Sequence, residues 1–256
     1  LTFDNLRGYD IKLNPEKCVF GVLAGKLVGF IISNRGIEAN PAKIRALSQL
    51  ATPADLKQVQ KLAGCMAALS RFISRLGEKA LPLYRLLRRT DNFEWTDAAT
   101  AGLEEIKTLL ASNPILAAPN AGEPMLLYIS ATHQVVSAVL VVEREQDGHK
   151  FPLQKPVYYV STILTPCKSW YPHYQKIAST VFMASRKLRH YFQECSITVA
   201  SEVPLNDIIN NRDATGRIAK WAIELLPFDI TYEPCQAIKS YVLADFVAEW
   251  TEAELP

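Results

Sequence analysis

The spacing of apolar residues changes along the chain, from a helical period in the first half to an alternating period after residue 123. Residues 1–13 fit the end of an amphipathic helix. The stretch "KCVFGVLAGKLVGFIIS" alternates apolar and polar positions and predicts a hairpin that turns at Ala24-Gly25. Pro41 then opens a short helix, "PAKIRALSQL". Residues 1–48 therefore predict a small unit built around a hairpin.

A cluster of helices is predicted over residues 49–115. Thr52-Pro53-Ala54-Asp55 offers a hydroxyl at the N-cap, a proline at the first helical position and a carboxylate near the free amides, so we expect a helix to begin at Pro53. Two or three helices fill the stretch to Ser112. The last of them opens after Trp95-Thr96, and Asn113-Pro114 ends it.

Residues 116–256 predict a three-layer α/β domain with a mixed five-stranded sheet. The first strand carries Ser130 at its end, where we expect the side chain to face solvent. The predicted strands are residues 125–131, 135–143, 156–163, 196–201 and 228–233, and the predicted helices are residues 171–192, 204–210, 214–226 and 240–250.

The helix that starts near Asp55 carries two stripes of residues at spacings of three and four. One stripe is apolar and predicts a core face: Leu56, Val59, Leu62, Met66, Leu69, Ile73 and Leu76. The other has cations at its ends and small residues in its middle: Lys57, Lys61, Gly64, Ala68, Arg71 and Arg75. A nucleic-acid backbone could approach closely over the small residues while the cations meet phosphates. The alternative is that Gly64 lets a neighbouring helix pack closely and that the cations are merely solvated.

The net charge of +2 is distributed unevenly. Between Lys43 and Arg89 there are ten basic and two acidic residues, whereas Trp221 to Pro256 holds seven acidic residues and one lysine. This asymmetry favours a polyanionic partner for the middle of the chain. The 49% hydrophobic content is ordinary for a folded protein. No apolar run reaches the roughly 18 residues of a membrane span, and residues 1–10 lack the pattern of a signal peptide.

Residue types that often carry chemistry are present but not clustered. The five cysteines are widely spaced, which argues against a disulfide framework or a zinc site and favours a reducing compartment. The four histidines share no ligand-like spacing, and no phosphate loop, nucleophile elbow or dinucleotide fingerprint occurs. We assign the four tryptophans to core or interface positions rather than to base stacking.

Consecutive segments of the chain resemble landmarks of the reverse transcriptases of gypsy-type LTR retrotransposons, especially those of plants. The segments are "DIKLNPEKCVFGV", "LVGFIISNRGIEANPAKIRAL", "DLKQVQKLAGCMAALSRFIS", "FEWTDAATAGLEEIKTLLASNPIL", "KPVYYVS" and "AKWAIELLPFDITYEP" with "VLADFVAEW". The resemblance implies a distal palm with a primer-gripping hairpin at residues 1–48, a helical thumb at 49–115 and an RNase H-like domain at 116–256. The family's Y-x-D-D polymerase loop would lie before Leu1, so we expect a fragment that does not polymerise by itself.

In that family, RNase H cleaves the RNA of a hybrid with two divalent metals held by four carboxylates. The resemblance places these four positions at Ser130, Ile177, Glu202 and Asp245. Only Asp245 keeps the family residue, and Glu202 is one methylene longer than aspartate. The resemblance therefore implies a catalytically degenerate connection domain without a cofactor of its own, while Mg²⁺ would serve the full-length enzyme.

The function implied is to position a template–primer duplex, either an RNA–DNA hybrid or a DNA duplex, through thumb and connection. The implied partners are the other Pol domains, with fingers and palm upstream and a second RNase H and an integrase downstream, and no membrane. The implied location is the cytoplasm, in a virus-like particle, with the nucleus as the alternative. Two other functions stay open. One is an active RNase H in which Glu143 or Asp207 joins Glu202 and Asp245, and the other is a purely structural interface with another polymerase subunit.

Overall fold

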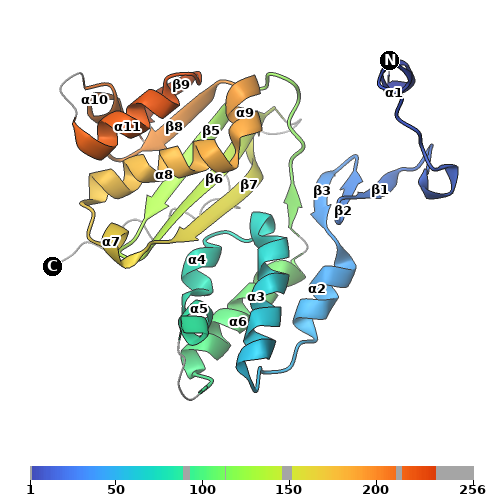
Figure 1. Ribbon diagram of the computed structural model, residues 1–256, viewed down its shortest axis with the longest axis horizontal. Helices are drawn as coiled ribbons and strands as arrows, with labels where there is room; N and C mark the ends of the chain where they lie inside the picture. The colour runs from blue at the N-terminus through green and yellow to red at the C-terminus, as the bar shows by residue number, and fades with distance from the viewer. Residues whose placement is uncertain (1, 89–92, 113, 146–151, 212–214, 235–256) are drawn as a thin grey trace.

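The computed structural model describes residues 2–88, 93–112, 114–145, 152–211 and 215–234, which form a hairpin unit, a helical unit and a larger α/β unit (Figure 1). None of the helices in these ranges combines the length and the apolar character that a bilayer crossing requires. The predicted helix at residues 240–250 lies outside the described residues.

The hairpin unit holds an antiparallel sheet in which β1, β2, β3 and β4 are neighbours in that order. Its strand β4 includes Ile115 and Leu116, the two residues on either side of the predicted boundary between the second and third parts. The elements are α1 (Thr2–Gly8), η1 (Pro15–Lys17), β1 (Ala24–Leu27), β2 (Phe30–Ser33), β3 (Gly36–Ala39), α2 (Pro41–Ser48) and β4 (Ile115–Leu116).

The predicted turn at Ala24-Gly25 is wrong, because these two residues begin β1 and the chain reverses at Val28-Gly29 instead. The two turn residues have φ angles of 48° and 81°. Positive φ at both positions gives a turn whose twist matches the flanking strands, and glycine adopts it without strain. The predicted helix start at Pro41 is confirmed, and the Asn40 side chain caps it by accepting from the Ala42 N–H.

Within the described residues, the helical unit contains four α-helices, more than the two or three predicted, and one 3-10 turn: α3 (Leu56–Leu69), η2 (Ser70–Phe72), α4 (Leu76–Lys79), α5 (Leu81–Arg88) and α6 (Asp97–Ala111). The first helix begins three residues later than predicted. Asp55, not Thr52, is its N-cap, because the Asp55 carboxylate accepts from the Gln58 N–H at 2.8 Å. The predicted start of the last helix is confirmed, with Thr96 as the N-cap of α6.

The α/β unit contains the predicted mixed sheet, with strand order β7-β6-β5-β8-β9. Strand β5 pairs antiparallel with β6 and parallel with β8. The predicted long helix is divided into α8 and α9 at Leu188, whose dihedrals leave the α region while its side chain stays buried. The elements are β5 (Met125–Ala131), β6 (Val135–Arg144), β7 (Leu153–Ile163), α7 (Pro166–Ser169), α8 (His173–Lys187), α9 (Arg189–Glu194), β8 (Ile197–Ser201), α10 (Leu205–Ile209), α11 (Gly216–Leu225) and β9 (Ile230–Pro234).

The five-stranded sheet has a hydrophobic core on each face. Successive strand residues point to opposite faces, and in β5 Leu127 joins the core with Val181 of α8 while Tyr128 joins the other core with Leu76 of α4. The helical unit therefore packs as a third layer against the face opposite α8 (Figure 1).

Candidate nucleic-acid interface

Helix α3 presents one apolar and one exposed face, as its sequence predicts. Val59, Leu62 and Met66 are buried in the core. Four of the six residues of the predicted cationic stripe share the exposed face of α3: Lys57, Lys61, Gly64 and Ala68. We call these four residues the α3 face.

Gly64 has open space beside it. A Cβ atom at Gly64 would meet no heavy atom within 4 Å, apart from its own helix. The close packing of a neighbouring helix that the sequence offered as an alternative explanation is therefore absent within the described residues. The glycine leaves a flat, accessible stretch between the two lysines and Ala68.

Arg71 does not belong to the α3 face, which corrects the prediction of a continuous stripe. Helix α3 ends at Leu69, and Arg71 lies half-buried in η2. Its guanidinium carbon is 5.0 Å from the ring centroid of Phe30 on β2 and 4.6 Å from that of Tyr158 on β7. These cation–π distances show that Arg71 connects the hairpin unit, the helical unit and the five-stranded sheet.

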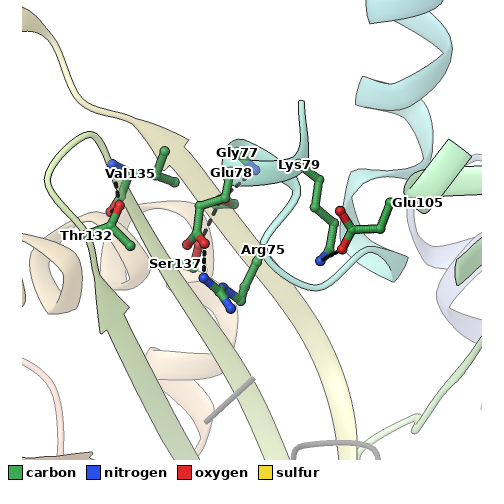
Figure 2. Close-up of polar contacts among 9 residues, drawn as sticks. Arg75, Gly77, Glu78, Lys79, Glu105, Thr132, Val135 and Ser137 are labelled. Atoms are coloured by element: carbon green, nitrogen blue, oxygen red, sulfur yellow. Dashed lines mark hydrogen bonds and ion pairs between the residues drawn. The ribbon is translucent and has the colours of Figure 1, made fainter. Parts of the chain in front are cut away.

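Arg75 also leaves the predicted stripe. It adopts a left-handed conformation with φ of 52°, is buried, and forms an ion pair with Glu78 one turn into α4 (Figure 2). The apolar residues Ile73 and Leu76 are buried as the helical pattern predicts, but the chain brings them to the core through a bend. The apolar spacing predicted the burial of Ile73 and Leu76 correctly. It did not predict the bend of the backbone that turns Arg71 and Arg75 inward.

The Ser130 side chain is buried, contrary to the expectation that it faces solvent. Ser130 is 6% exposed and lies next to Ser137 of β6 in register. By strand alternation it points to the same face as Tyr128, the face on which α4 packs. On that face Ser137 Oγ lies 2.9 Å from Ser161 Oγ, and Ser161 Oγ accepts from the Gly77 N–H at 2.9 Å. Figure 2 shows Gly77 and Glu78 of α4 beside Ser137.

Two of the other three positions implied by the RNase H resemblance lie within the described residues. Ile177 is 2% exposed and belongs to the core between α8 and the sheet. Glu202 is half-exposed, and its Oε1 lies 3.0 Å from His173 Nε2 at the start of α8. Asp245 lies outside the described residues.

Sequence reasoning missed Ser201, the last residue of β8. Its side chain is buried and accepts from the Val203 N–H at 3.1 Å, whereas Glu202 is already beyond the strand. Strand β8 runs parallel to β5, with Ala200 opposite Tyr128. Ser201 therefore lies at the same end of the strands as Ser130. The only signal in the sequence was the end of the alternating pattern in "SITVAS".

The residues described do not fit a two-metal site. No group of three or more His, Cys, Asp or Glu within the described ranges lies close enough to share an ion. Glu143 accepts a hydrogen bond from the Gln154 side chain. It follows Val142, which is opposite Met125 at the start of β5, so it lies at the opposite end of the strands from Glu202. Asp207 is exposed on α10. The carboxylates proposed to rebuild an active site thus do not converge in this part of the chain.

One buried cation is hydrogen-bonded to the turn that follows β5. Lys176 of α8 is mostly buried, and its Nζ donates to the His133 carbonyl oxygen at 3.3 Å. Burial lowers the pKa of Lys176, because desolvation disfavours the ammonium form. The Lys176 ammonium group holds the turn between β5 and β6 through this hydrogen bond. An ammonium group cannot coordinate a divalent cation.

Residues 95–199 match a family described as the RNase H-like domain found in reverse transcriptase. Among curated relatives, the chain is 25% identical over 231 residues to the retrovirus-related Pol polyprotein from transposon 297 of Drosophila melanogaster, covering 88% of this chain and 20% of that protein. It is also 25% identical over 245 residues to the transposon Tf2-3 polyprotein of Schizosaccharomyces pombe (strain 972 / ATCC 24843), covering 91% of this chain and 18% of that protein. The chain spans about a fifth of the length of these relatives.

Solved structures of a foamy viral protease-reverse transcriptase share the fold. One, in complex with double-stranded DNA, has a TM-score of 0.67 at 21% identity and covers 84% of this chain and 38% of that chain. Another, in complex with an RNA/DNA hybrid, has the same TM-score and identity and covers 84% of this chain and 30% of that chain.

Residues 95–199 are thus similar to the RNase H-like domain found in reverse transcriptase, and the fold agrees with this match. Most of the chain is similar to retrotransposon Pol polyproteins, and the matched domain begins at α6 of the helical unit.

Proposed function

We propose that the chain is the thumb and connection region of a gypsy-type retrotransposon reverse transcriptase and that it positions a template–primer duplex, either an RNA–DNA hybrid or a DNA duplex. The helical unit would be the thumb, and the hairpin before it would approach the primer end. The observation that carries the proposal is the α3 face, where Lys57, Lys61 and Gly64 are exposed and no described residue outside the helix itself lies within 4 Å of a Cβ atom placed at Gly64.

The chemistry of the α3 face suits a nucleic-acid backbone. Two exposed ammonium groups supply attraction to phosphates that does not depend on base sequence. The missing side chain at Gly64 and the methyl group of Ala68 let sugars approach the helix closely. The similar foamy viral structures are described as complexes with double-stranded DNA and with an RNA/DNA hybrid, which supports a duplex as the ligand.

In this proposal the RNase H-like domain serves as a rigid connection rather than as a nuclease. Three of its four implied catalytic positions hold a buried serine, a core isoleucine and a glutamate that contacts a histidine, and the fourth, Asp245, lies outside the described residues. Mg²⁺ would then serve only the polymerase and nuclease domains of a full-length protein. The partners would be those Pol domains and an integrase, in a cytoplasmic virus-like particle, with the nucleus as the alternative.

The decisive experiment measures binding of the full chain to a labelled blunt duplex by fluorescence anisotropy over a salt series. In the double variant Lys57→Gln and Lys61→Gln, affinity should fall, and the slope of log affinity against log salt should flatten by about 1.8, because each lost phosphate contact removes about 0.9. Gly64→Leu keeps the charge but adds bulk, so it should weaken binding with little change in slope. Lys220→Gln, at an exposed lysine of α11, is the matched control.

Unchanged affinity and slope in the double lysine variant would overturn the proposal and favour the purely structural interface. Unfolding of Gly64→Leu is not expected, because the glycine has no neighbour that a side chain would displace. Circular dichroism of each variant separates a folding defect from a binding defect.

A further inference from the structure

A pocket of about 240 Å³ lies where α5 of the helical unit meets the α/β unit. Its polar lining comes from both units: Tyr84, Arg85 and Arg88 on α5, Gln134 in the β5–β6 turn, and Ser169 on α7. The remaining lining residues are apolar, so the pocket contains two arginines and no carboxylate. None of the residues of the α3 face lines it.

The charge of the pocket is not neutralised by its own polar groups. Arg85 donates to the Gln134 side-chain oxygen at 2.6 Å, and this partner is an uncharged amide. Burial raises the pKa of Tyr84, so the phenol stays protonated at neutral pH and adds no negative charge. Two guanidinium groups and a serine hydroxyl offer the planar, charge-assisted donors that phosphate groups accept best.

An exposed tryptophan directly follows Ser169, which lines this pocket. Trp170 is 82% exposed, so it is not a core residue, and the alternative assignment to an interface stays a prediction. Its ring and the His133 ring form a T-shaped pair, with centroids 6.4 Å apart and an interplanar angle of 88°. His133 precedes Gln134 in the turn that Lys176 holds through its hydrogen bond. The indole thus has the His133 ring beside it and is otherwise mostly exposed to solvent.

We propose that the pocket and Trp170 bind a single nucleic-acid strand, with a backbone phosphate at Arg85 and Arg88 and an unpaired base stacked on the indole. Aromatic stacking next to a cationic groove is a sequence-tolerant way to hold single strands. A blunt duplex keeps its bases stacked inside the helix and offers none to Trp170. This site goes beyond the proposed function, because it rests on different residues and selects a different form of nucleic acid.

The test compares binding of the full chain to labelled oligothymidine and to a blunt duplex. Trp170→Ala should weaken binding of the single strand about thirtyfold, the middle of the range for loss of one stacked base, and leave the duplex unaffected. Trp170→Phe should retain most of the affinity, since the phenyl ring still stacks. Arg88→Gln should flatten the salt slope for the single strand by about 0.7. Leu226→Ala removes an exposed apolar side chain from the end of α11 and is the matched control.

Equal affinity of the wild-type chain, Trp170→Ala and Arg88→Gln for oligothymidine would overturn the inference, as would an equal loss of duplex and single-strand binding in Trp170→Ala. The two proposals fail separately. If the α3 lysine variants leave duplex binding unchanged while Trp170→Ala weakens single-strand binding, the single-strand site stands and the duplex-positioning function falls.

Discussion

Two glycines of the helical unit have opposite surroundings, and neither has a positive φ. A Cβ atom at Gly77 would lie 2.6 Å from Ser161 Oγ and 2.7 Å from Val135 Cγ1, while one at Gly64 would meet nothing within 4 Å. The packing role that the sequence offered for Gly64 thus belongs to Gly77. The absence of a side chain at Gly77 lets α4 lie directly on the sheet and lets its N–H reach Ser161.

Alanine at these two positions should have opposite effects on the free energy of unfolding. Gly77→Ala forces a methyl group into a filled space and should destabilise the chain by about 1–3 kcal/mol. Gly64→Ala adds a methyl group in open space and removes the unfavourable helix propensity of glycine, so it should stabilise by up to about 1 kcal/mol. Urea unfolding followed by circular dichroism measures both. A Gly77→Ala chain as stable as the wild type would show that α4 does not pack closely on β6 and β7.

At the scale of the elements, apolar periodicity predicted burial better than it predicted the path of the chain. The five strands of the mixed sheet and the helix after Thr96 are where the pattern placed them. The α3 stripe was extended too far because Ile73 and Leu76 keep helical spacing, although the backbone bends at Arg75. Ile73 and Leu76 are buried in the core although they are not part of α3. The spacing of apolar residues therefore could not show that Arg71 and Arg75 turn inward.

The candidate sites were predictable to different degrees. The resemblance implied that carboxylates are missing at Ser130 and Ile177, but the sequence predicted an exposed Ser130, which is in fact buried. It could not show that β8 ends at Ser201, since alternation defines the faces of a strand and not its last residue. The pocket near Trp170 could not be predicted either, because its walls come from residues 81–88, 134 and 163–169, which only the fold brings together.

Strand β9 gives a pH-dependent contribution to stability through Tyr232. Burial raises the pKa of Tyr232 to about 12, above the value of about 10 for an exposed tyrosine. Because the folded state favours the protonated phenol, its contribution is complete below about pH 10 and is lost as pH rises from about 10 to about 12. Urea unfolding across this range should show a smaller loss of stability in Tyr232→Phe than in the wild type. Identical pH profiles would mean that β9 leaves Tyr232 accessible to water.

At the scale of the whole molecule, the three units share a continuous interior. A single core contains Ala39 of the hairpin unit, Leu83 of the helical unit and Tyr159 of the sheet. Arg71 contacts rings on β2 and β7 from its place in η2, and Lys79 of α4 forms an ion pair with Glu105 of α6 (Figure 2). These contacts favour a single rigid unit in which the α3 face and the pocket lined by Arg85 and Arg88 keep a fixed distance and orientation. Such a relation is what a region that positions a duplex requires.

The full chain should not cleave the RNA of an RNA–DNA hybrid with Mg²⁺ or Mn²⁺. Two metal ions need several converging carboxylates to balance their charge, and the described residues supply none at Ser130, Ile177 or Ser201, while Glu202 contacts His173. Ser130→Asp should not create activity either, because it places one carboxylate in a buried position without the other ligands. A gel assay with a labelled hybrid measures this, and melting with and without Mg²⁺ should give nearly equal midpoints. Metal-dependent cleavage that Asp245→Asn abolishes would contradict the prediction and establish the chain as an active RNase H.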